Sequence, residues 1–446
     1  MNRRQLLKAI VASGAATTLP WVNTVRAQAI LPGDYKALVS IFLFGGNDSF
    51  NLIAPRSPAE YNVYAQSRQN LAIDQADLLP IVSDNPDGAL YGFHPAASGL
   101  RSLFDEGDLA VVANIGPLIQ PTTKTQLQAL SVALPPQLFS HNDQQGQWQT
   151  LRGISQVRSG WAGRVADYFD GAQPNASLAM NISMSGNSML LSGESAIPYA
   201  MSPDGAIAYG ALSGDAEFAA ARLTSFEAQL QRAYANAHSR AFQAIHRRAL
   251  ASADTVNTAL AKAPVLNTAF PNSGLGRQLQ AVARMLAVRD EFGAQRQIFA
   301  TSMGGFDTHD RQNQEQPELF MEISEAMHAF QLALRELGLQ DQVTTFTQSD
   351  FGRTLTSNGD GTDHGWGSHQ VVMGGAVAGR RIVGTMPLLE IDGPDDVSGG
   401  RMIPTTSSDQ YAASLARWFG VDDAALLDMM PSLANFEQRD VGLFSG

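Results

Sequence analysis

Short apolar runs that stop at glycine-rich turns constrain the fold of this chain more than any other feature. Residues 37–44 (ALVSIFLF) are apolar and rich in β-formers, and they stop at Gly45-Gly46. Continuous apolar runs of this length, bounded by turn residues, are typical of strands buried in a parallel sheet. The same reasoning predicts strands over residues 37–44, 109–115, 297–302, 342–347, 370–373 and 381–383.

Helical patterns fill the intervals between these strands. Alternation of strands and helices over such a length is typical of an α/β fold with a mostly parallel sheet. The segment at about 216–262 is helical and rich in alanine, and we expect it to form a helical insertion. Helices are predicted over residues 215–251, 275–292, 317–337, 408–419 and 422–430.

The composition excludes several classes of protein. The 446 residues include no cysteine, which excludes disulfides, thiolate-bound zinc, iron–sulfur clusters and a cysteine nucleophile. The formal net charge of -12 argues against nucleic acid as a partner, because phosphates are bound by basic surfaces. The same charge is compatible with binding cations. We expect residues 30–446 to form a single α/β domain with its insertion.

The first 29 residues have the organisation of an export signal. Arg3 and Arg4 precede a short apolar stretch over residues 9–19, and Ala27-Gln28-Ala29 supplies a small-residue cleavage site. The paired arginines and the modest hydrophobicity resemble a twin-arginine signal. We therefore expect residues 1–29 to be removed and the product to be periplasmic or secreted, with membrane contact only during export.

Carboxylates and imidazoles gather at the ends of the predicted strands. Six Asp and His residues stand in or beside glycine-rich turns there. Ligands of open parallel sheets bind beyond the carboxyl ends of the strands, so we expect these side chains to converge. Without thiols, such a set suits one or two divalent ions, zinc or manganese above all. The predicted metal ligands are Asp48, Asp307, His309, Asp350, His364 and His369.

Each of these residues also has a simpler structural explanation. Asp48 could cap the helix that follows it, and Asp350 could pair with Arg353. Asp307 and His309 could stand in an ordinary polar turn, and His364 and His369 could be hydrogen-bonded structural histidines. The combined pattern favours a metal site, because unrelated caps have no reason to fall on Asp or His at successive strand ends.

Several short motifs extend from the first strand to the last helix. They are FGGND (44–48), FHP (93–95), SH (140–141) with Trp148, GGFDTH (304–309), SDFGR (349–353), DHGWGSH (363–369) and PTT to WFG (404–420). A chain with these motifs resembles the domain-of-unknown-function family numbered 1501, over nearly all of its length after residue 29. Members of that family typically carry twin-arginine signals, and the family is similar to the alkaline phosphatase and sulfatase superfamily. The resemblance implies a three-layer α/β/α sandwich that is alkaline-phosphatase-like.

The same resemblance implies roles for individual residues. Superfamily members hold one or two metal ions with an Asp after the first strand, an Asp and a His after a later strand, a further strand-end Asp and a final His. In this chain those ligands correspond to Asp48, Asp307, His309, Asp350 and either His364 or His369. This chain departs from the pattern at Phe351, where phosphatases place a His directly after the Asp.

The resemblance also points to a nucleophile at the start of a helix. Ser140, next to His141, has a suitable place, and the alternative is that Ser140 only caps the helix. The lack of cysteine excludes the formylglycine that sulfatases make from that residue. Arg353 or Arg164 could bind an anionic substrate.

Two functions of different classes follow from these observations. The first is an exported metal-dependent hydrolase of phosphate or sulfate esters, acting on an anionic small molecule or polymer. The alternative is a non-catalytic periplasmic binding or assembly protein that keeps the fold and at most a structural metal. The sequence leaves the oligomeric state open. A dinucleotide-binding enzyme is disfavoured because the glycine run at 374–379 lacks the required spacing.

Overall fold

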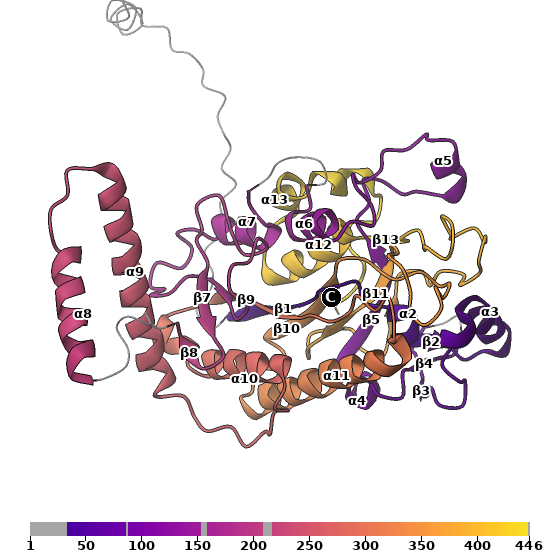
Figure 1. The fold of residues 1–446 in the computed structure, drawn as a ribbon, viewed down its shortest axis with the longest axis horizontal. Coiled ribbons are helices and arrows are strands. Elements are labelled where there is room, and N and C mark those ends of the chain that lie inside the picture. Colours follow the sequence, from indigo (N-terminus) through magenta and orange to yellow (C-terminus); the bar gives the residue numbers. More distant parts are fainter. Residues whose placement is uncertain (1–33, 86–87, 153–157, 208–215, 445–446) are drawn as a thin grey trace, which may run out of the picture.

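The computed structural model describes residues 34–85, 88–152, 158–207 and 216–444. The predicted export signal lies outside these residues. The described chain forms a ten-stranded mixed sheet with helices on both sides (Figure 1), so the predicted α/β sandwich with a mostly parallel sheet is confirmed. None of the described helices has both the length and the apolar composition needed to cross a membrane.

Three parallel strands form the centre of the sheet. β1 (Lys36–Leu43) lies between β9 (Arg296–Met303) and β10 (Val343–Ser349) and is parallel to both. The other strands are β5 (Leu109–Gly116), β6 (Asn181–Ser183), β7 (Tyr199–Ser202), β8 (Gly205–Ala206), β11 (Ser368–Met373), β12 (Ile382–Val383) and β13 (Thr406–Ser407). Their order is β12-β5-β11-β10-β1-β9-β6-β7-β8, and β13 also pairs with β5. Only β11 and β8 run antiparallel to their neighbours in this described sheet.

The two faces of the sheet pack against separate groups of helices. Side chains alternate along β1, so that Val39 and Ile41 face one apolar cluster while Leu38 and Phe42 face another. The first face is covered by α4 (Ser98–Glu106), α10 (Gly274–Ala287) and α11 (Gln312–Glu336). The second is covered by α6 (His141–Thr150), α7 (Trp161–Tyr168), α12 (Ser408–Phe419) and α13 (Asp423–Met429).

A small antiparallel sheet lies beside the main one. It consists of β2 (Ile53–Pro55), β4 (Tyr91–Phe93) and β3 (Leu79–Ile81), with β4 in the middle. Three further helices are α2 (Ser49–Leu52), α3 (Pro58–Arg68) and α5 (Lys124–Gln128), and short 3₁₀ turns lie at Gln69–Leu71, Arg289–Phe292 and Pro431–Asn435. α3 ends at Arg68, which forms an ion pair with Asp48.

The six predicted strands agree with the structure to within two residues at each end, but three helices differ. The helix predicted over 275–292 is α10, which ends at Ala287 and is followed by the 3₁₀ turn at Arg289–Phe292. The predicted helix over 215–251 is two helices, α8 (Ala216–Leu230) and α9 (Ala237–Leu260). The chain breaks there because Asn236 caps α9, its Oδ1 accepting from the backbone N–H of His238 at 2.8 Å. α11 begins at Gln312 rather than at Pro317. The buried Gln312 side chain accepts a hydrogen bond from Thr308 Oγ1 and donates one to Asp48 Oδ2.

Candidate metal centre

Three neighbouring strand ends place their loops at one edge of the sheet. β1 leads to Asp48, β9 leads to Asp307, and β10 is followed directly by Asp350. The first loop depends on glycine, because Gly45 has φ +116° and a Cβ there would lie 2.4 Å from the backbone nitrogen of Asp307. Gly46 has φ +90°. The loops after β1 and β9 therefore approach each other more closely than any side chain would allow.

Three histidines surround the carboxylate of Asp307. The Nε2 atoms of His309 and His364 lie 3.1 Å and 3.3 Å from its Oδ1, and Nε2 of His141 lies 3.3 Å from its Oδ2. The Nε2 atoms of His309 and His364 are 3.0 Å apart. The four side chains come from segments that are far apart in sequence, and they meet at the carboxyl edge of the sheet.

Each imidazole is held from outside through its other nitrogen. Nδ1 of His141 lies 2.6 Å from Asp350 Oδ2, Nδ1 of His364 lies 2.7 Å from the carbonyl oxygen of Phe139, and Nδ1 of His309 lies 3.3 Å from Asp363 Oδ1. Carbonyl and carboxylate oxygens only accept, so Nδ1 carries the hydrogen and the Nε2 lone pair points inward.

This arrangement fits a divalent cation. Two inward lone pairs 3.0 Å apart repel each other unless a cation lies between them. Around a tetrahedral ion with bonds of about 2.0–2.1 Å, neighbouring ligand atoms are about 3.3 Å apart, close to the distances seen around Asp307. The ligand atoms of His141, Asp307 and His364 all lie within 4.8 Å of one another. Nε2 of His141 is also buried without a hydrogen-bond partner among the described residues.

The charges around the cluster favour the forms that bind metal. Burial alone would raise the pKa of Asp307, but the hydrogen bond and positive charge of Arg353 outweigh it and hold this pKa below its ordinary value. Burial lowers the pKa of His364, and Arg353 and His141 lower it further. An ionised carboxylate and a neutral imidazole are the protonation states of metal ligands.

Arg353 is fully buried and hydrogen-bonded to this cluster, whereas the sequence suggested that it could bind an anionic substrate. Its Nη1 donates to Asp307 Oδ1 at 2.6 Å and to the carbonyl of Gly45 at 3.1 Å. Its Nε donates to Thr362 Oγ1 at 3.2 Å, and Nη2 donates to the Thr362 carbonyl. Arg164, the other candidate for a substrate anion, is buried and donates to the carbonyls of Ser159, Thr150 and Met429.

Asp350 lies one layer behind the histidine cluster. It is fully buried, and its Oδ2 accepts from Nδ1 of His141 and, at 2.8 Å, from Nε2 of Gln145. Because Nδ1 and Nε2 lie on opposite sides of an imidazole ring, this oxygen cannot contact an ion that Nε2 of His141 binds. In this structure Asp350 holds the ring of His141 from behind, whereas the sequence pattern predicted a metal ligand at this position.

Asp48 and His369 have partners of their own away from the cluster. Asp48 is buried in an ion pair with Arg68, and its Oδ2 also accepts from Nε2 of Gln312 at 2.7 Å. His369 lies inside β11, where Nδ1 accepts from the backbone N–H of Asn114 at 3.0 Å. Burial lowers the pKa of His369 to about 3, so its ring is neutral. Of the two candidate histidines, only His364 reaches Asp307.

The Ser140 hydroxyl is hydrogen-bonded to Asp143 rather than to a residue of the cluster. Ser140 precedes the first residue of α6, and its Oγ donates to Asp143 Oδ2 at 2.6 Å rather than capping the helix backbone. The neighbouring His141 is the residue that enters the cluster. The ring of Phe351 packs 4.7 Å from the rings of both His141 and His364, so it fixes their orientation.

Sequence reasoning missed four groups that contact the predicted site residues. Asp363 directly precedes His364, and Gln145 stands four residues after His141 on the same face of α6, so both had a sequence signal. The carbonyl of Phe139 and the guanidinium of Arg68 had none. Their roles depend on segments that only the folded chain brings together.

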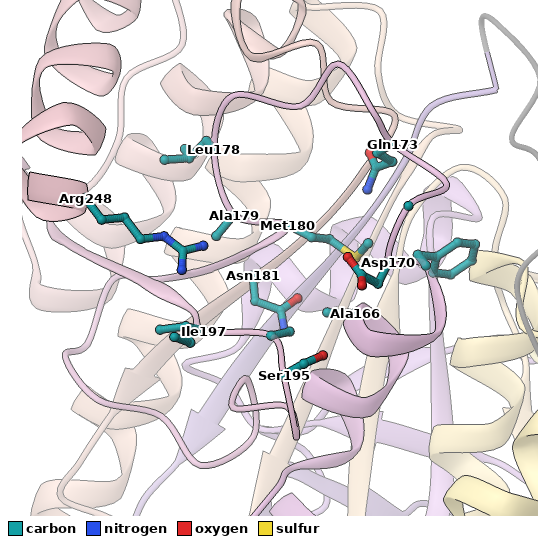
Figure 2. Close-up of a pocket in the computed structure, with 13 residues that line it drawn as sticks. Ala166, Asp170, Gln173, Leu178, Ala179, Met180, Asn181, Ser195, Ile197 and Arg248 are labelled. Carbon is teal, nitrogen blue, oxygen red and sulfur yellow. The ribbon is translucent and has the colours of Figure 1, made fainter. Parts of the chain in front are cut away.

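A separate cavity of about 290 Å³ lies at the opposite edge of the sheet (Figure 2). Met180 and Asn181 line it at the start of β6, and Ile197 lines it just before β7. Asp170 and Arg248 are the charged residues on its walls. None of the predicted site residues lines this cavity, so the histidine cluster is the better candidate for chemistry.

Comparison with known proteins gives a family match and similar solved structures, among them two of Ps i-CgsB. The family described as "Protein of unknown function (DUF1501)" matches residues 35–430. The structure of Ps i-CgsB with k-i-k-neocarrahexaose is similar at 10% identity and a TM-score of 0.33, and that of Ps i-CgsB alone at 8% and 0.36. Both comparisons cover 91% of this chain and 77% of the other. A search of curated proteins finds no match.

Proposed function

We propose that this chain, which belongs to the DUF1501 family, binds a divalent metal ion and hydrolyses phosphate or sulfate esters at the carboxyl edge of its sheet. The ligands in this proposal are His141, Asp307 and His364, whose ligand atoms lie within 4.8 Å of one another, and His309, which lies next to Asp307 and His364. One observation carries it: three Nε2 atoms converge on one carboxylate, while each Nδ1 is held by an oxygen from outside.

The donor set favours zinc, with manganese as the next choice. Three imidazole nitrogens and one carboxylate oxygen, without thiols, match the mixed nitrogen and oxygen ligation of hydrolytic zinc sites. All the close ligand pairs share Asp307 or His364, so we propose one ion rather than two.

The proposed chemistry assigns a task to each group of residues. When bound, a divalent ion supplies Lewis-acid activation of water and of the scissile ester. Asp350 keeps the His141 ring in place, as outer carboxylates do in metal sites. Arg353 keeps Asp307 ionised. The side chains of Asp307 and His309 are each 44% exposed, so a substrate can approach from solvent.

Water is the nucleophile in this proposal. The Ser140 hydroxyl is donated to Asp143, so Ser140 would first have to break that hydrogen bond to attack. In hydrolysis the water oxygen forms a bond to phosphorus or sulfur, the ester bond from that atom to the leaving oxygen breaks, and the water proton goes to the leaving group. Export by the twin-arginine route, with residues 1–29 removed, remains part of the proposal.

Metal analysis and an ester panel test the proposal together. The chain from residue 30 onward, purified without affinity metals, should contain about one divalent ion and hydrolyse phosphate or sulfate esters. His141→Gln and Asp307→Asn should lose both the metal and the activity, and His238→Gln, at an exposed histidine, should keep both. Ester hydrolysis that survives chelation and Asp307→Asn would show that this centre is not the catalyst.

A non-catalytic binding or assembly protein with a structural metal is the second candidate. The burial of Arg353 favours it, because this arginine is fully buried and four of its five N–H groups already donate to Asp307, Gly45 and Thr362. Stoichiometric metal that raises the melting temperature, with no turnover on any ester, would support this second candidate.

A further inference from the structure

The α8–α9 hairpin projects from the edge of the sheet. Among the described residues of the hairpin, Val256, Ala259 and Leu260 in the last turns of α9 belong to the apolar core. The rest of the hairpin stands beyond β7 and β8 at the periphery of the molecule (Figure 1). Its outer surface is therefore available to a partner.

Two large apolar side chains are exposed on α9. Phe242 is 58% exposed and Ile245 is 66% exposed. Because they are three residues apart in a helix, they lie on one face. A groove of about 390 Å³ between the helices adjoins Phe242 and is lined also by Leu230 and Tyr234. Exposed apolar side chains beside an apolar groove are a common mark of an interaction surface.

The hairpin is basic in a chain that is otherwise acidic. Residues 216–260 contain five arginines and three acidic residues, a net charge of +2, so the rest of the chain carries -14. Arg232 lies in the connecting loop, and Arg247 lies on α9 about 140–200° around the axis from Phe242 and Ile245. Both arginines are exposed. Arg248, which is exposed three residues after Ile245, borders the apolar pair, and Arg247 lies on the opposite side of α9.

We propose that this hairpin docks on an anionic phospholipid surface. Phe242 and Ile245 enter the boundary between headgroups and acyl chains, and Arg232 and Arg247 contact the headgroups. Amphipathic helices with arginine on one side and large apolar residues on the other bind membranes in this way. The acidic remainder of the chain is repelled by the same surface, so the hairpin alone faces it.

A second copy of the chain is a poorer occupant. Two hairpins of charge +2 repel each other when they meet face to face. If the hairpin of one copy bound the acidic remainder of another, the contact would be head-to-tail. Such a contact does not form a closed two-fold dimer. Charge complementarity therefore favours an anionic lipid over a second chain.

Vesicle co-sedimentation of the chain from residue 30 onward tests the proposal. We expect binding to vesicles of phosphatidylcholine mixed with phosphatidylglycerol, little binding to phosphatidylcholine alone, and weaker binding as salt is raised. Arg232→Gln with Arg247→Gln should reduce partitioning about 30-fold, since each basic residue near the surface contributes about fivefold. Phe242→Ser with Ile245→Ser should reduce it at least about tenfold.

Matched controls alter similar residues elsewhere on the surface. Arg277→Gln removes an exposed arginine of α10, and Val265→Ser removes a side chain that is 93% exposed outside the hairpin. Both should bind vesicles as the unaltered chain does. The proposal is overturned if neither vesicle binds, if the hairpin variants bind as well as the controls, or if the chain forms a dimer that Phe242→Ser with Ile245→Ser dissolves. None of these outcomes depends on the proposed hydrolase activity.

Discussion

Replacing Asp350 with Asn asks whether this carboxylate orients His141 or binds the metal itself. Oδ2 of Asp350 accepts from both His141 and Gln145, whereas its Oδ1 is buried without a partner. An Asn side chain can place its oxygen at the Oδ2 position and keep both hydrogen bonds. The substitution therefore removes the negative charge behind His141 while preserving the position of its ring.

The magnitude follows from this outer position. Loss of an outer partner of a metal-binding histidine costs roughly 10–100-fold in metal affinity. Asp350→Asn keeps the hydrogen bonds, so we expect a loss of about tenfold, or about 1.4 kcal/mol. Asp350→Ala also leaves Nδ1 of His141 without its acceptor, and we expect a loss near 100-fold. Asp307→Asn removes a ligand and should abolish stoichiometric binding.

Competition against a chromophoric chelator at fixed pH measures the affinity, and elemental analysis measures the stoichiometry. Asp360→Asn is the matched control, since Asp360 is an exposed acid in the loop that leads to Thr362. If Asp350→Asn abolishes stoichiometric metal binding as Asp307→Asn does, then Asp350 is a direct ligand, and its placement behind His141 as an orienting residue is wrong. If Asp350→Ala binds metal with unchanged affinity, its carboxylate does not orient His141.

Three further predictions concern the supports of the site and the core. Asp48→Asn leaves the buried guanidinium of Arg68 without its carboxylate, so urea unfolding should show a loss of about 3–5 kcal/mol while metal affinity in the folded protein stays within a few-fold. Burial raises the pKa of Asp409 from 3.8 to about 7, so folding favours the neutral acid, and the associated stability is full below the unfolded pKa and is lost as pH rises through the folded pKa. Asp409→Asn should therefore unfold like the unaltered chain near pH 3 and become more stable by up to about 4 kcal/mol above about pH 7, and an equal difference at both pH values would contradict this assignment. Gly46→Ala adds a Cβ 2.5 Å from the Phe351 ring at φ +90°, so thermal melts should show a loss of about 2 kcal/mol or more, and an unchanged melt would show that the loop can relax.

Much of the fold could be predicted because its signals are local. An apolar run such as ALVSIFLF, stopped by Gly45 and Gly46, predicts a buried strand from a few adjacent residues. The small sheet of β2, β3 and β4 was missed because each of its strands is only three residues long. The break between α8 and α9 was missed because alanine-rich sequence continues through it, and only the cap at Asn236 marks the new start.

The sequence by itself determined the edge of the sheet at which polar groups collect, because parallel strands end on the same side and each is followed by its own loop. Tertiary structure decided which of those groups face one another. Arg68, at the end of α3, forms an ion pair with Asp48. His141 is hydrogen-bonded to Asp350, from which it is separated by 209 residues in sequence, so the imidazole faces the cluster and the carboxylate of Asp350 lies behind it. A buried carboxylate must be paired, so it binds whichever cation or imidazole the fold places beside it. That pairing left Asp307, with His309 and His364, at the open centre of the site.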